Sequence, residues 1–249
     1  MSIHKAREYC YIYEINLRTL RKNMEKVIGF LTELRENNDR EWFEANKKEF
    51  KEAQAEFNAF VEQLIEGIAS FDSSVRGLAV KDCVYRIYRD VRFSKDKSPY
   101  KTHMGAFICP GGRNSGNAGY YFHIEPTHDG MIGANILSGG IYMPSPAAIK
   151  SIREDILYNG DQFLEAVKKA QGFVLECRGA LKRVPVGFPA DHPMSEYLKM
   201  KEDMSLYKYV DNDFLLAPRL LERIVAEYEK TAAFVGWLNR AVDYARGEM

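Results

Sequence analysis

The chain has 249 residues, of which 46% are hydrophobic, and this is enough to bury one sizeable core or two small ones. Lysines and arginines number 35, as do aspartates and glutamates, so the formal net charge is zero. A neutral chain lacks the long-range field that drives strong non-specific binding to nucleic acids or membranes. A local cluster of cations must therefore bind any anionic ligand.

The four cysteines lie far apart, and no pair has the spacing of a zinc site or a redox motif. Scattered cysteines of this kind are typical of reduced thiols in a cytoplasmic protein. No apolar run reaches the roughly 18 residues that a membrane span needs. The N-terminus carries charged residues but no apolar signal core. We therefore expect a cytoplasmic protein that does not bind membranes.

Residues 1–23 show no clear periodicity, and a regular pattern begins after Met24. We interpret residues 1–23 as an N-terminal extension of doubtful status, with Met24 as an alternative or true start. A strand through Tyr11, Ile12 and Tyr13 is the other interpretation. Residues 24–249 contain neither a repeat nor a low-complexity linker, so we predict that they form a single domain.

Amphipathic helices are predicted at both ends of this domain. Near the first end, Asn38 and Glu41 resemble a capping box at the start of a long helix. Ser145 followed by Pro146 predicts another helix start in the middle of the chain, and Pro218 opens a long terminal helix. The first long helix carries a stripe that is typical of a core, with apolar residues at Phe43, Phe50, Phe57 and Leu64.

Four strands are predicted between these helices, over residues 78–93, 102–109, 119–126 and 131–137. In the last three, apolar residues alternate with polar ones, which is typical of an antiparallel meander with one buried face. The fold class is therefore α+β: an antiparallel sheet with this meander at its centre, packed on one face by the long N- and C-terminal helices. The side chains expected on the packed face include Ile87, Phe122, Ile124 and Ile136.

Cationic side chains are concentrated between Val84 and Lys101. Alternate residues of a strand share a face, so Arg86, Asp90 and Arg92 are expected side by side. Guanidinium groups grip two oxygens of a phosphate or carboxylate at once. We therefore predict an anion site in which Arg86, Arg92, Lys97 and Tyr100 converge beside His123. The residues predicted to bind the ligand are Arg86, Arg92, Lys97, Tyr100, Lys101 and Tyr121.

The alternative for this segment is a ladder of salt bridges, in which each exposed pair contributes about 0.2–1 kcal/mol. Arg89 lies on the opposite face from Arg86, which is the face assigned to the core. A buried arginine needs a carboxylate partner, so we predict a structural role for Arg89. A β-bulge that turned Arg89 to the other face would reverse this prediction.

Polar residues Tyr121, His123 and Glu125 alternate along the third predicted strand. His123 could act as a general acid or base and Glu125 could orient it, while Asp90 could hold an arginine or accept a proton. The tentative catalytic residues are therefore His123, Asp90 and Glu125. His103 could join His123 and Glu125 as a third metal ligand, but H-x-E alone is a weak signal and we assign no metal ligand.

No phosphate loop of the form G-x-x-x-x-G-K-[ST], no nucleophile elbow and no G-x-G-x-x-G motif is present, so the sequence identifies no cofactor. The run Arg86-x-x-Arg89-Asp90-x-Arg92-Phe93-x-x-x-Lys97-x-x-Tyr100 resembles the R-x-x-R-D-x-R-F-x-x-x-K-x-x-Y signature of a family known only as a domain of unknown function. This family occurs in bacteria and fungi. Further similar segments lie at 37–47, 119–126, 139–144, 182–193 and 234–240.

The resemblance extends from about Met24 to the C-terminus and leaves out residues 1–23. It implies a single domain, and it brings no established activity and no catalytic residues. The function therefore has to be inferred from the residues themselves.

Three classes of function are open. The favoured one is binding of a small phosphate- or carboxylate-bearing ligand, with or without His-assisted hydrolysis or transfer. The second is a domain that binds or processes nucleic acid, in which arginines pair with phosphates and Tyr85, Tyr88 and Tyr100 stack on bases. The third is an interaction module without chemistry. An enclosed pocket favours the first, and a positive groove as wide as a single strand favours the second.

Overall fold

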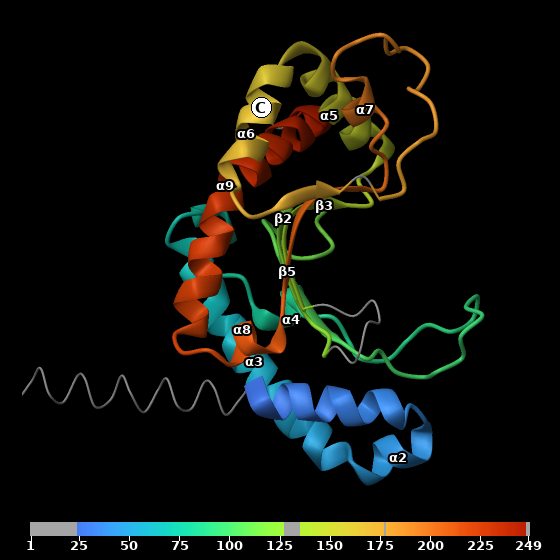
Figure 1. The fold of residues 1–249 in the computed structure, drawn as a ribbon, viewed down its shortest axis with the longest axis vertical. Coiled ribbons are helices and arrows are strands. Elements are labelled where there is room, and N and C mark those ends of the chain that lie inside the picture. Colours follow the sequence, from blue (N-terminus) through green and yellow to red (C-terminus); the bar gives the residue numbers. More distant parts are fainter. Residues whose placement is uncertain (1–23, 127–134, 177, 248–249) are drawn as a thin grey trace, which may run out of the picture.

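A computed structural model describes residues 24–126, 135–176 and 178–247. In this part of the chain, a five-stranded antiparallel sheet with the strand order β1-β2-β3-β5-β4 forms one layer, and helices form the other (Figure 1). The proposed extension 1–23 lies outside the described residues, as does most of the predicted strand 131–137. The strands are β1 Met104–Ile108, β2 Gly119–Ile124, β3 Asn135–Tyr142, β4 Val174–Glu176 and β5 Asp203–Val210.

A helix over residues 24–36 precedes the other helical elements. The sheet is flanked by two long helices, α3 Lys47–Ala69 and α9 Leu220–Arg246. At the end where α9 finishes, α5, α6 and α7 pack together (Figure 1). The remaining elements are α2 Arg40–Ala45, η1 Ser73–Val75, α4 Val80–Cys83, α5 Pro146–Tyr158, α6 Gly160–Lys169, α7 Ser195–Leu198 and α8 Asn212–Leu216.

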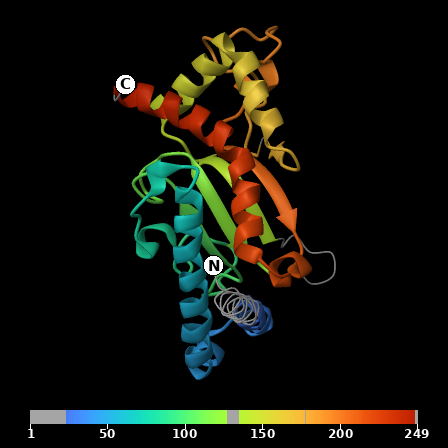
Figure 2. The same cartoon turned by 90° about the vertical axis from the view of Figure 1, so that its left-hand side faces the viewer.

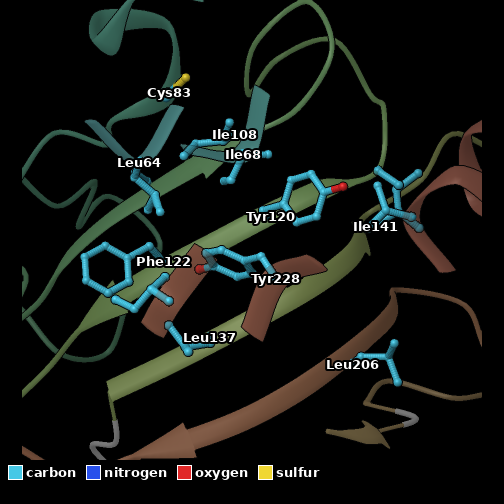
Figure 3. Close-up of a cluster of buried hydrophobic side chains, with 14 of the residues drawn as sticks. Leu64, Ile68, Cys83, Ile108, Tyr120, Phe122, Leu137, Ile141, Leu206 and Tyr228 are labelled. Atoms are coloured by element: carbon cyan, nitrogen blue, oxygen red, sulfur yellow. The ribbon is translucent and has the colours of Figure 1, made fainter. Parts of the chain in front are cut away.

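Both long helices cover the same face of the sheet, and Figure 2 shows α3 and α9 in front of the strands. Phe122 of β2 is fully buried there, with its ring centroid 5.9 Å from that of Phe57 and 5.3 Å from that of Phe60. Tyr228 of α9 is also fully buried and donates a 2.7 Å hydrogen bond to the carbonyl oxygen of Tyr121 (Figure 3). The predicted arrangement, with helices on one face of an antiparallel sheet, is confirmed.

The start of the first long helix differs from the capping-box prediction. Asp39, and not Asn38, caps α2, because its side chain accepts a hydrogen bond from the backbone N–H of Trp42. Asn38 instead holds the backbone of Tyr100, donating to its carbonyl at 3.0 Å and accepting from its N–H at 3.1 Å. At the middle helix the prediction is confirmed, since Ser145 caps α5 and is followed by proline.

Residues 78–93 do not form the predicted strand. Val80–Cys83 is a helix, and beyond it the chain is extended with two isolated bridges, Val84 to Ala106 and Tyr88 to Tyr100. The chain turns back between Tyr88 and Tyr100, so that Arg89 N–H bonds the Pro99 carbonyl and Lys101 N–H bonds the Ile87 carbonyl. We call residues 84–103 the arm. It leaves the sheet on the side away from α3 and α9 (Figure 1).

The charged turn inside the arm explains the wrong prediction. Pro99 and the polar run before it favour a turn, so pairing across the turn is limited to the Tyr88–Tyr100 bridge and its two backbone hydrogen bonds.

One assignment of a side chain to a face is also wrong. Phe122 and Ile124 are buried beneath the helices as predicted, and Ile87 is buried in the same core. Ile136, however, pairs with His123 and lies on the other face, while Leu137 pairs with Phe122 and takes the helix-facing place. Because side chains alternate along a strand, a shift of one residue moves the whole set to the opposite face.

Candidate functional site

The face of the sheet that α3 and α9 leave uncovered forms the floor of a cavity of about 500 Å³. Register places Phe107, Tyr121 and Ser138 on this face, because they are paired across β1, β2 and β3. Strand β5 adds Ser205 and Tyr207 to the floor. The arm supplies Tyr85 and Lys101 to one wall, and the loops after β1 and β4 supply Arg113 and Arg178.

Three cationic side chains line the cavity. Among the described residues that line it, Lys101, Arg113 and Arg178 carry positive charge and no aspartate or glutamate occurs. Tyrosines 85, 121, 142 and 207 add aromatic surface with hydroxyl groups. Concentrated positive charge in a chain with no net charge is the local cluster that an anionic ligand requires.

Lys101 and Arg113 lie near one aromatic ring, that of Tyr85. The Lys101 Nζ atom is 5.5 Å and the Arg113 Cζ atom 5.8 Å from the centre of the ring. These are cation–π distances, so the ring keeps two like charges in one wall. Burial, and then the charge of Arg86, lowers the pKa of Lys101 from its ordinary value.

Arg178 is fixed on the other side by several contacts. Its Cζ atom lies 4.4 Å from the centre of the Tyr207 ring, and its Nε donates a 2.7 Å hydrogen bond to Glu176. A further guanidinium N–H donates to the Tyr209 hydroxyl, which in turn donates to Glu176 at 2.7 Å. The guanidinium group is therefore pre-oriented beside the cavity and still has N–H groups to offer.

A cluster of titratable side chains lies at one end of the floor. The Tyr121 hydroxyl is 2.7 Å from His123 Nδ1, and His123 Nε2 is 3.3 Å from Glu125 Oε2. The other carboxylate oxygen of Glu125 accepts hydrogen bonds from Thr102 at 2.8 Å and Arg35 at 3.0 Å. Burial by itself would raise the pKa of Glu125, but hydrogen bonds from His123 and Thr102 outweigh it and lower the pKa to about 2.

His103 completes this cluster from the arm. Its ring stacks on that of His123, with the centroids 4.5 Å apart. Burial, and then the nearby His123, lowers the pKa of His103 to about 4. One ligating atom from each of His103, His123 and Glu125 lies within 4.8 Å of the other two. The arrangement can hold a metal ion or move a proton to or from a bound group.

The structure brings together part of the predicted site. Lys101, Tyr121 and His123 line the cavity, and Glu125 contacts His123 from beside it. Arg86 is exposed and lines a separate hollow along α3, together with Arg113. The arm therefore contributes to the cavity through residues 85, 101 and 103 rather than through the arginines of its turn.

The other predicted ligand residues lie elsewhere. Arg92 forms two hydrogen bonds with Asp90, at 2.6 and 2.9 Å, and 77% of its side chain is exposed. This is a single exposed salt bridge between residues two apart in the chain, not the ladder given as the alternative. Lys97 donates to the carbonyl of Val91 at 2.9 Å.

Tyr100 is buried and stacks on Phe43 with the ring centroids 3.9 Å apart. The prediction that Arg86, Arg92, Lys97 and Tyr100 converge beside His123 is therefore wrong. It failed because residues 78–93 do not form the predicted strand: Val80–Cys83 is helical, and the chain beyond it pairs with residues 99–101 across a turn.

Arg89 has the carboxylate partner that its predicted structural role requires. It forms an ion pair with Asp96 and a hydrogen bond with Ser98, and it lies 3.4 Å from the Ser94 hydroxyl. Hydrogen bonds from Ser98 and then from Arg89 lower the pKa of Asp96 to about 2. Arg89 is half-buried and closes the turn of the arm, rather than lying within the core.

We expect the substitution Arg89→Met to lower the melting temperature by about 2–4 °C, since it removes the guanidinium group whose contacts with Asp96 and Ser98 close this turn. Arg86→Met is the matched control, because Arg86 is exposed on the same arm, and little change is expected. Thermal denaturation followed by circular dichroism measures both. Equal melting temperatures for the two variants would contradict the structural role.

Much of the cavity wall comes from residues outside the predicted site. Arg113 lies in a glycine-rich loop whose composition is typical of a flexible connection. No sequence pattern predicts that Arg178 lies near the arm. Ser205 and Tyr207 did carry a signal, because they alternate with the buried Met204 and Leu206 along β5.

Fold and cavity together define an α+β protein with a candidate small-molecule site on the open face of an antiparallel sheet. The family model described as "Conserved hypothetical protein (DUF2461)" matches residues 26–237, so the chain belongs to this family. No curated protein and no solved structure matches the chain. Within the described ranges, each helix is too short or too polar to cross a bilayer.

Proposed function

We propose that this protein binds a small phosphate- or carboxylate-bearing molecule in the cavity on the open face of the sheet. The observation that carries the proposal is the set of three cations, Lys101, Arg113 and Arg178, without a carboxylate among the described lining residues. The volume of about 500 Å³ lies in the range of small-molecule sites, roughly 300–1,000 Å³.

The anionic group would lie between the two cationic walls. Lys101 and Arg113 approach from the arm side, and Arg178 approaches across β5. The hydroxyl groups of Ser138 and Ser205 on the floor add hydrogen bonds to the same group. Each charge-assisted hydrogen bond contributes about 1.5–3 kcal/mol. The tyrosines leave an aromatic surface for the uncharged part of the ligand.

The cluster at the end of the floor supports a chemical step on the bound group. His123 lies beside the anion site and is contacted by both Tyr121 and Glu125. We propose that it assists hydrolysis or transfer of that group. An enzyme is therefore preferred over an interaction module without chemistry.

Nucleic-acid binding is the second candidate, and the arm carries its evidence. Phe93 is 96% exposed, and Arg92, Lys95 and Lys97 lie beside it in the chain. An exposed aromatic ring among cations can stack on a base and pair with phosphates. The neutral overall charge disfavours this function, because non-specific affinity comes mainly from phosphate neutralisation.

Calorimetric titration with inorganic phosphate, pyrophosphate, nucleoside monophosphates, dicarboxylates and a short single-stranded oligonucleotide tests both candidates. We expect one of the small anions to bind the wild type, and Arg178→Met or Lys101→Met to weaken binding by about tenfold or more. Arg92→Met is the matched control, because Arg92 is an exposed cation outside the cavity. Melting temperatures confirm that each variant is folded.

Two results would overturn the proposal. One is a wild type that binds none of the small anions. The other is a pair of folded cavity variants that bind as tightly as the wild type. Oligonucleotide binding that Arg92→Met abolishes would favour the second candidate instead.

A further inference from the structure

We infer that His103, His123 and Glu125 form a site for a divalent transition-metal ion at the end of the cavity floor. This inference rests on the proposed function. It specifies how the histidines would assist the reaction, which is by holding a metal ion beside the bound anion. It revises the sequence analysis, which assigned no metal ligand. Two imidazole nitrogens and one carboxylate oxygen are a common ligand set for such ions.

One distance within the cluster is that expected for two ligands of a shared ion. The three ligating atoms lie within 4.8 Å of one another, and His123 Nε2 is 3.3 Å from Glu125 Oε2. Two ligands that each lie about 2.0–2.2 Å from a tetrahedral zinc ion are separated by about 3.3–3.6 Å. The separation of these two atoms is therefore that of neighbouring ligands.

Strand geometry brings two of the ligands together. His123 and Glu125 are two residues apart, so they point to the same face of the sheet. His103 precedes β1 and its ring stacks on His123 from the side of the arm. In the described part of the chain, neither ring nitrogen of His103 has a hydrogen-bond partner, although the ring is half-buried and faces the cavity. A ring nitrogen of His103 is therefore available to bind an ion.

Neighbouring residues hold His123 and Glu125 in place, as residues around a metal site usually do for the ligands. The Tyr121 hydroxyl contacts His123 at Nδ1, which leaves Nε2 for an ion. Thr102 and Arg35 hold one oxygen of Glu125, which leaves Oε2 on the side of His123. In both ligands one atom is fixed by the protein and the other points into the cluster.

The surrounding charges limit which ion fits. Arg35 contacts Glu125, and Lys101 is two residues from His103, so a divalent ion meets repulsion from nearby cations. Such a site favours ions that bind imidazole strongly, such as Zn²⁺ or Co²⁺, over Mg²⁺ or Ca²⁺, which depend on several oxygen ligands. Three protein ligands leave one position for an oxygen of the bound anion, where the ion would act as a Lewis acid.

Direct metal titration tests the inference. The whole protein is treated with a chelator, dialysed and titrated with Zn²⁺ in a calorimeter, and Co²⁺ binding is followed by its visible absorption. We expect one ion per chain to bind at this cluster, and we expect His103→Asn and Glu125→Gln each to weaken binding by at least about tenfold. His192→Asn is the matched control, because His192 does not line the cavity, and it should bind as the wild type does.

His103→Asn is the deciding variant, since it leaves the hydrogen bonds of His123 and Glu125 in place. A wild type that binds neither ion, or a folded His103→Asn variant that binds as tightly, would overturn the inference. Titration with phosphate and nucleotides in the absence and presence of Zn²⁺ separates the two proposals. Metal binding without anion binding would support the metal site and overturn the proposed function. Anion binding without metal binding would support the proposed function and overturn the metal site.

Discussion

Replacement of Phe122 by alanine is expected to lower the free energy of unfolding by about 3–5 kcal/mol. The ring has no exposed surface and packs against Phe57 and Phe60 of α3. Removing it exchanges these contacts for a void between sheet and helix, where close packing prevents full collapse. Urea denaturation followed by circular dichroism measures the change.

Phe93→Ala is the control for this experiment. Phe93 is 96% exposed at the turn of the arm, so its removal should change the unfolding free energy by less than about 0.5 kcal/mol. A domain of this kind is stable by about 5–15 kcal/mol, and the Phe122 variant should therefore lose a large part of its stability. A similar cost for both variants would mean that the core between α3 and β2 is not packed as described.

The second large effect is expected for Gly119→Ala at the start of β2. A Cβ atom added to Gly119 would lie 2.4 Å from the Ile108 carbonyl oxygen and 2.4 Å from the Cys109 Cβ atom. The carbonyl belongs to the backbone of the paired strand and cannot rotate away. We expect a loss of about 3 kcal/mol or more in unfolding free energy, because overpacking against a backbone forces the strands apart.

Gly29→Ala is the matched control, and it is expected to stabilise the protein. Gly29 lies in the helix over residues 24–36, and an added Cβ would meet no atom within 4 Å. Alanine restricts the unfolded chain and suits a helix, so the variant should gain about 0.4–1 kcal/mol. Thermal and urea denaturation of both variants measure the difference. Equal stability of the two would contradict the close approach of β1 and β2 at Gly119.

The fold could be predicted where the local pattern and the final contacts agree. Phe43, Phe57 and Leu64 follow the helical period and are all buried, and Phe122 follows the strand period. The prediction failed at residues 84–93, where β-branched and aromatic residues favour a strand. Pro99 and the charged turn bring the chain back, and contacts within the turn, such as that of Arg89 with Asp96, prevail over strand propensity.

The candidate site, too, could be predicted only in part. Tyr121 and His123 lie on β2 and Glu125 directly follows it, and continued alternation places the three on one face. Arg113 and Arg178 come from loops whose positions depend on the packing of the whole domain, so no local pattern indicates that they meet Lys101. The face of Ile136 was assigned wrongly because the register of β3 is set by its neighbours rather than by its own sequence.

The two edges of the sheet affect how copies of the molecule meet one another. A long flat strand with free backbone groups pairs with strands of other molecules and begins aggregation. Here β4 has three residues, and β1 is partly covered by the arm through the Val84–Ala106 bridge and the 3.0 Å hydrogen bond from Tyr85 N–H to the Gly105 carbonyl. The arm thus protects the β1 edge from intermolecular pairing while its inner residues form a wall of the cavity.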